Sequence, residues 1–145
     1  MTYLIDTNIF IFLLEDNFKR LSIKQIDILS NPDNDLYLSE ASFYEMGIKV
    51  RMNQFGTKRV SNEDFVNVNI LTVEEDRKRL NIKLLKSKPT YYMNIPNVSM
   101  VLKKNGDRHG DPFDLLIISQ AMVENLPILS SDEYFPSYPG LTTIT

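Results

Sequence analysis

Four acidic residues are spaced along the chain so that each lies near the end of a predicted strand or the start of a predicted helix. Asp6 and Asp132 follow short apolar runs, Asp114 falls in the first turn of a helix, and Glu45 lies on a helix that follows a strand. Because ligands bind beyond the carboxyl ends of the strands in an open α/β sheet, we expect these four carboxylates to converge there.

Such a cluster points to a divalent cation. Carboxylates held together without a counter-charge repel one another and raise one another's pKa values, which a bound cation relieves. The chain has no cysteine and only one histidine, so a thiolate site is excluded. Oxygen ligands favour Mg²⁺ or Mn²⁺ over Zn²⁺.

Three of these acids also have structural interpretations. Asp6 or Thr7 could cap the helix that follows, and Asp132 could cap a short turn through Tyr134. Asp114 could be a favourable charge near a helix N-terminus. We favour the functional interpretation for Asp6, Asp114 and Asp132, because each lies at the same predicted edge of the sheet.

The remaining polar residues have structural alternatives of their own. Glu45 follows Ser42 as in a capping box and precedes Lys49 as in an exposed ion pair, although Lys49 is also well placed to support the site. Asp111 precedes a proline and is interpreted chiefly as a helix cap. His109, the single histidine, is interpreted as structural or solvated and is left out of the mechanism.

Apolar patterning and turn residues predict the elements that must position these side chains. Short β-prone runs predict strands at residues 3–5, 36–39, 68–71, 126–129 and 141–144. Helical spacing predicts helices at residues 9–14, 22–29, 41–52, 72–86 and 112–122, with a further helix start at 61–64. The segment from 90 to 108 is expected to be a loop with one or two helical turns.

Capping signals support several helix starts. Thr7 or Asn8 is expected to cap the first helix, while Ser22 and Thr72 each precede a glutamine or glutamate by three residues, as in a capping box. The helix from 72 to 86 is basic, and we interpret it as a solvated face, with a phosphate-binding track as the alternative. Pro89 is expected to end it.

Alternating strands and helices predict a three-layer α/β/α fold with a mostly parallel central sheet of about five strands. The length of 145 residues predicts one domain spanning residues 1–145. The net charge of −3 argues against a protein that coats nucleic acid through bulk charge. No apolar run approaches the ~20 residues of a membrane span and no leader is recognisable, so a cytoplasmic protein is expected.

Four segments, in order, resemble the motifs of PIN domains, in particular those of VapC-type toxins of bacterial type II toxin–antitoxin systems. The resemblance covers nearly the whole chain and rests on Tyr3-Leu4-Ile5-Asp6-Thr7-Asn8, on residues 38–49 around Glu45, on His109-Gly110-Asp111-Pro112-Phe113-Asp114-Leu115, and on Leu129-Ser130-Ser131-Asp132.

The resemblance implies that Asp6, Glu45, Asp114 and Asp132 hold Mg²⁺ or Mn²⁺, with Thr7 or Asn8 supporting the first acid. It implies a metal-dependent endoribonuclease that hydrolyses RNA phosphodiester bonds, a homodimer, and a cognate antitoxin that covers the site. The chain departs from the family pattern at Leu115, where many relatives have arginine, and in residues 86–108, which are longer and more basic than expected.

Two other functions remain compatible with the sequence. A receiver-like signalling domain also carries acids at the carboxyl edge of a parallel sheet, but it requires a lysine after a late strand and none follows Lys104. A non-catalytic PIN-like binding module would bind metal without cleaving RNA.

Overall fold

The computed structural model describes residues 1–52 and 68–145 of the chain. The helix start predicted at 61–64 lies outside the described residues. Within them, five strands form one sheet in which every pair of neighbours is parallel. The strands are β1 (Thr2–Ile5), β2 (Asp35–Ser39), β3 (Lys83–Leu85), β4 (Ile128–Leu129) and β5 (Thr143–Ile144). The prediction of a parallel sheet of about five strands is confirmed.

The strand order, β3-β2-β1-β4-β5, makes β1 the central strand. The chain builds outward on one side of β1 through β2 and β3, and on the other side through β4 and β5. The order therefore reverses between β1 and β4, and such a switch point opens a ligand-binding crevice beyond the strand ends. This order also differs from the 2-1-3-4-5 order of receiver-like domains, which argues against that alternative.

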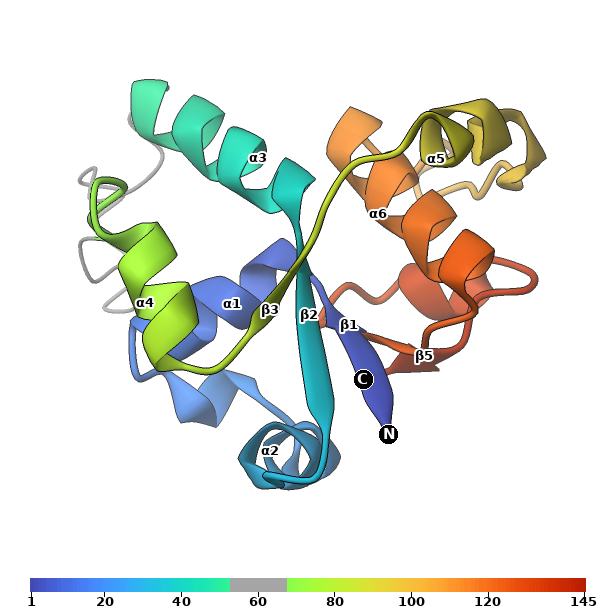
Figure 1. The fold of residues 1–145 in the computed structure, drawn as a ribbon. Coiled ribbons are helices and arrows are strands. Elements are labelled where there is room, and N and C mark those ends of the chain that lie inside the picture. The colour runs from blue at the N-terminus through green and yellow to red at the C-terminus, as the bar shows by residue number, and fades with distance from the viewer. Residues whose placement is uncertain (53–67) are drawn as a thin grey trace.

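Helices cover both faces of the sheet, so the predicted three-layer arrangement is confirmed (Figure 1). In this view α1, α3 and α4 lie to one side of the strands, and α5 and α6 lie to the other. Across the described residues, no helix is long and apolar enough to cross a membrane. The α-helices are α1 (Thr7–Leu14), α2 (Ile23–Ser30), α3 (Glu40–Arg51), α4 (Val73–Arg79), α5 (Pro89–Asn94) and α6 (Pro112–Glu124).

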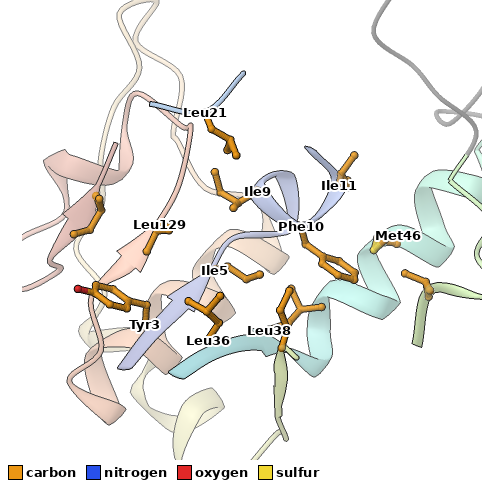
Figure 2. Packing of buried hydrophobic residues seen from close by; sticks show 13 residues of the cluster. Tyr3, Ile5, Ile9, Phe10, Ile11, Leu21, Leu36, Leu38, Met46 and Leu129 are labelled. Atoms are coloured by element: carbon orange, nitrogen blue, oxygen red, sulfur yellow. The ribbon is translucent and has the colours of Figure 1, made fainter. Parts of the chain in front are cut away.

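Alternate residues of the strands face opposite helical layers, as the two-residue period of a strand requires. Tyr3 and Ile5 point to the layer containing α1, where Ile5 lies near Phe10 and near Leu38 of β2 (Figure 2). Met46 of α3 extends the same cluster. This apolar layer fixes the carboxyl end of β1 against the helices that follow β1 and β2.

The opposite face of β1 packs against α6. Leu4 and Ile128 of β4 are completely buried there against Ile117 and Ile118, which lie on the middle of α6. Burying an apolar side chain of this size contributes about 1.5–3 kcal/mol, so the cluster secures α6 on the sheet. The N-terminus of α6 is thereby held beside the crevice.

One predicted strand is wrong. Residues 68 and 69 have no regular structure and residues 70–72 form a turn. The Asn69 side chain accepts a hydrogen bond from the Leu71 amide, and the Asn69 carbonyl accepts one from the Thr72 amide. Leu71, which the prediction placed in this strand, is almost fully exposed. The third strand is instead β3, which pairs with β2 through Lys83, opposite Tyr37.

The basic helix predicted at 72–86 is shorter than predicted and spans Val73–Arg79. Asn81 adopts a left-handed backbone with φ of +55°, which ends α4 at Arg79, and Ile82 then turns into the core before β3 begins. The predicted capping box at Thr72 is also wrong, because the Thr72 side chain caps no helix amide. It bonds Asp76 instead.

Other local predictions are confirmed. Ser22 and Gln25 form a reciprocal capping box at α2. Asp111 caps α6 with Pro112 in the first helical position. Residues 90–108 contain α5 and a short 3-10 helix, Ile95–Asn97, in an otherwise irregular segment. The strand predicted at 126–129 is shorter and spans Ile128–Leu129, and the strand predicted at 141–144 spans Thr143–Ile144.

Candidate metal centre

Asp6 lies at the carboxyl end of β1 and is the cap of α1. Its Oδ1 accepts a hydrogen bond of 2.7 Å from the Thr7 amide, and its Oδ2 accepts one of 2.9 Å from the Ser130 hydroxyl. The residue is 4% exposed. Burial raises the pKa of Asp6 to about 7, against the hydrogen bond from Ser130, and the carboxylates of Asp114 and Glu45 add to the increase.

The two residues expected to support Asp6 do so only in part. Thr7 contributes its backbone amide, while its hydroxyl donates to Ser42 on α3 across 2.9 Å. Asn8 is exposed and, within the described residues, its side chain forms no hydrogen bond with Asp6. The expectation that Thr7 or Asn8 caps the first helix is wrong, because Asp6 is the cap.

Asp114 lies in the first turn of α6, three residues after Asp111. Asp111 Oδ1 accepts from the amides of Phe113 and Asp114, and Asp114 Oδ2 accepts in return from the Asp111 amide. This reciprocal box leaves Asp114 Oδ1 directed at no protein donor among the described residues. Burial raises the pKa of Asp114 to about 6, and the carboxylates of Asp111, Glu45 and Asp132 contribute.

Glu45 lies on α3 and is 8% exposed. Its Oε1 is 2.9 Å from the Lys49 ammonium one turn later, so the ion pair expected between them is present. The capping-box interpretation with Ser42 is wrong, because α3 begins at Glu40 and its cap is Ser39. Lys49 therefore supports Glu45 by charge.

Asp132 is positioned by three hydrogen bonds in the loop after β4. Its Oδ1 accepts from the Tyr134 amide at 2.8 Å, as its structural interpretation predicted. Its own amide donates to Ser130 Oγ at 3.1 Å, so one hydroxyl connects Asp132 to Asp6. Its Oδ2 lies 2.9 Å from His109 Nε2, which is the donor because a carboxylate only accepts.

His109 was expected to be structural or solvated, and the structure shows it buried and hydrogen-bonded rather than solvated. It is 7% exposed, and its Nδ1 lies 2.9 Å from the Tyr138 hydroxyl, so both ring nitrogens are engaged. The Tyr138 hydroxyl also lies 3.2 Å from the His109 carbonyl oxygen. Burial raises the pKa of Tyr138 to about 12, which keeps the phenol protonated.

Gly110 makes this contact possible. It adopts a left-handed backbone with φ of +91°, and a Cβ there would lie 2.7 Å from the Tyr138 hydroxyl. Only glycine fits this turn without displacing Tyr138. The one signal in the sequence was a histidine directly before Gly110 and the α6 cap, which does not reveal a partner at position 132.

The structure thus brings the four predicted carboxylates into one electrostatic site. Asp114 and Glu45 raise the pKa of Asp6, and Glu45 and Asp132 raise the pKa of Asp114, so electrostatic interactions link the four carboxylates. The tightest group of possible ligand atoms belongs to His109, Asp114 and Asp132, which lie within 4.8 Å of one another. Asp6 and Glu45 are not members of that tightest group.

This arrangement fits a divalent cation. In the described part of the chain, no lysine or arginine forms an ion pair with Asp6 or Asp114, although burial and neighbouring carboxylates oppose their ionisation. A cation bound among these oxygens would remove that repulsion. Oxygen donors from carboxylates, with no thiolate in the chain, match the preference of a hard ion.

The chain matches a family model described as PIN domain over residues 3–141. No curated protein sequence is significantly similar to it.

Two solved structures share its fold. A chain of VapBC2 from Rickettsia felis, crystallised with a DNA fragment from the promoter, has a TM-score of 0.66 and 16% identity, over 99% of this chain and 98% of that chain. A chain of VapBC-1 from nontypeable Haemophilus influenzae has a TM-score of 0.62 and 21% identity, over 99% and 97% of the respective chains. At these identities the likeness is one of fold.

Proposed function

The chain belongs to the PIN domain family, whose members are generally nucleases, and from this we propose that it is a divalent-metal-dependent endoribonuclease. The reaction is the hydrolysis of RNA phosphodiester bonds. The observation that supports the proposal is a set of linked acidic groups: Asp114 and Asp132 lie with His109 within 4.8 Å of one another, and Asp6 and Glu45 each interact electrostatically with Asp114.

In this proposal Asp6, Glu45, Asp114 and Asp132 hold Mg²⁺ or Mn²⁺. The bound ion would lower the pKa of a water molecule to supply the nucleophile and would stabilise the charge that develops on the phosphate. The protein's own part is to fix the carboxylate oxygens before the substrate arrives.

Three of the four carboxylates are oriented by neighbouring groups. The Ser130 hydroxyl and the Thr7 amide orient Asp6, and Lys49 orients Glu45. His109 orients Asp132. Because these partners are held by burial or by short hydrogen bonds, the oxygens need little rearrangement to receive an ion.

We also propose that the chain is the toxin of a type II toxin–antitoxin pair that acts on RNA in the cytoplasm, as a homodimer. The fold likeness to chains in two VapBC structures, over nearly their full length, supports this proposal. A cognate antitoxin, encoded by a small reading frame directly upstream, would then suppress the cleavage when the two proteins are mixed.

The test is cleavage of a labelled single-stranded RNA by the purified chain, with Mg²⁺ or Mn²⁺ and with EDTA. We expect cleavage only with the divalent ion, and we expect Asp6→Asn and Asp114→Asn to abolish it. Asp27→Asn, on the exposed surface of α2, is the matched control and should leave the rate unchanged.

Cleavage that survives either crevice variant would contradict the proposal. The non-catalytic alternative has its own signature. A divalent ion would raise the melting temperature of the chain, since any ligand specific for the folded state does so, while no RNA would be cut under any condition.

A further inference from the structure

Residues 101–109 form a hairpin-like loop, hereafter the basic hairpin. Its ends pair through an antiparallel bridge between Leu102 and Arg108 and through the His109 amide, which donates to the Val101 carbonyl at 2.8 Å. The Lys103 amide closes the turn by donating to the Asp107 carbonyl at 2.7 Å. The backbone of this loop is therefore fixed by its own hydrogen bonds.

The basic hairpin also contacts Glu133 and Tyr134, which follow Asp132 in the loop after β4. The Lys104 amide donates to the Tyr134 hydroxyl at 3.2 Å, and the Lys104 ammonium lies 3.1 Å from Glu133. Val101 is buried in the cluster beneath α6, and His109 bonds Asp132. These contacts set the position of the hairpin relative to the carboxylates.

Two cations of the hairpin remain available. Lys103 and Arg108 are exposed and line a cavity of about 520 Å³ together with His109, Asp114 and Asp132. Among residues 1–52 and 68–145, no acidic side chain forms an ion pair with either. They are cations at the rim of the proposed metal centre with no protein partner in this part of the chain.

The basic helix α4 shows the contrasting case. Arg77 is 2.6 Å from Glu74, and Arg79 is 2.8 Å from Asp76, so the acids in the first turn neutralise the cations in the last. Arg77 also donates to the Ile82 carbonyl. The cations of α4 are thus paired within their own helix, whereas Lys103 and Arg108 of the hairpin line a cavity.

We propose that Lys103 and Arg108 bind phosphate groups of the RNA backbone on either side of the scissile bond and so hold the strand at the crevice. This rests on the proposed ribonuclease function. A chain of net charge −3 with a cluster of carboxylates repels RNA, and nearby cations offset that repulsion. The guanidinium of Arg108 suits two-point contact with a phosphate, and the Lys103 ammonium acts as a point charge.

The experiment measures binding separately from cleavage. A fluorescein-labelled single-stranded RNA of about ten nucleotides is titrated with the full-length chain in EDTA, at salt concentrations from about 50 to 200 mM, and anisotropy gives Kd. For the double variant Lys103→Ala/Arg108→Ala we expect a Kd at least about 10-fold higher and a salt slope smaller by about 1.4, since each phosphate contact on a single strand contributes about 0.7.

Two control variants make the result specific. Lys24→Ala removes an exposed cation from α2 and should change neither Kd nor slope. Arg108→Lys keeps the charge, and it should retain the salt slope while losing part of the affinity. Melting temperatures equal to wild type confirm that the exposed substitutions leave the fold intact.

An unchanged Kd and slope in the double variant would overturn the proposal, as would a wild-type chain that binds no RNA at about 50 mM salt. The outcome for the proposed function is separate. If RNA binding depends on Lys103 and Arg108 but no divalent ion gives cleavage, the ribonuclease proposal fails and the phosphate site stands. If cleavage occurs and the slope is unchanged, only the phosphate site fails.

Discussion

The N-termini of α1 and α6 each carry a carboxylate of the candidate metal centre, and they use their acidic residues differently. At α1 a single residue, Asp6, is both the helix cap and a deeply buried carboxylate with a pKa of about 7. At α6 the two tasks are divided, because Asp111 is the exposed cap and Asp114 is the crevice carboxylate. Capping geometry alone therefore does not separate an acid proposed as a metal ligand from a structural one; burial and neighbouring charge distinguish the two here.

The largest effect we expect comes from comparing Asp6→Asn with Asp111→Asn in the RNA cleavage assay. Removing an outer partner of a metal ligand already costs about 10–100-fold, so loss of a proposed ligand should lower the rate by more than about 100-fold. Asp111→Asn keeps the cap and should stay within about threefold of wild type. Similar losses of cleavage rate in the two variants would contradict the proposal that Asp6 is a metal ligand and Asp111 only a helix cap.

Substitutions of His109 test the role of Asp132, the one proposed ligand that lies in a loop and not at or in a helix. His109→Ala leaves Asp132 Oδ2 without its donor, and we expect Mg²⁺ or Mn²⁺ affinity, measured by calorimetry, to fall by about 10–100-fold. His109→Gln restores an N–H and should recover part of the affinity. If His109→Ala binds metal like the wild type, its contact with Asp132 is structural only.

Next in size is the pH dependence of stability without metal. Burial holds the pKa of Asp6 at about 7 and that of Asp114 at about 6, both above the ordinary aspartate value of 3.8. The folded state then binds more protons than the unfolded state, so these groups stabilise the fold at low pH and that contribution is lost as pH rises towards 7. In EDTA we expect the melting temperature to fall by roughly 5 °C between about pH 5.5 and 8.

The same measurement with Asp6→Asn supplies the control. The amide carries no charge and still favours the cap position, so the fall in melting temperature should be smaller than in wild type. A divalent ion should restore the wild-type melting temperature at about pH 8, because it binds the ionised form. A wild-type melting temperature that rises with pH in EDTA would contradict the conclusion that burial raises the pKa values of Asp6 and Asp114.

The smallest effect separates capping from charge at α6. Asp111→Ala removes the side chain that accepts from two helix amides, and it should lower the free energy of unfolding by about 1 kcal/mol. Asp111→Asn should recover most of that loss. Urea denaturation measures both, and an equal loss in the two variants would mean that the charge of Asp111, rather than its cap, stabilises α6.

Local patterns predicted the parts of the fold that depend on nearby residues. The buried run before Asp6, the capping box at Ser22 and the cap and proline before Asp114 all specify backbone conformation within a few residues. The same local logic misled the prediction at residues 68–71, where the side chain of Asn69 forms a turn. It also extended the basic helix into residues 83–85, which pair with β2.

The sequence by itself determined that acids follow strands and begin helices, and the order of its motifs identified the family. Only the tertiary structure decided which groups meet. Ser130 bonds Asp6 across 124 positions of sequence, and His109 bonds Asp132 across 23. Such contacts depend on which strands become neighbours and on how α6 packs against the sheet, and these are set by burial of residues distant in the chain. For this reason the carboxylates were predictable as candidates, while the partners that orient them were not.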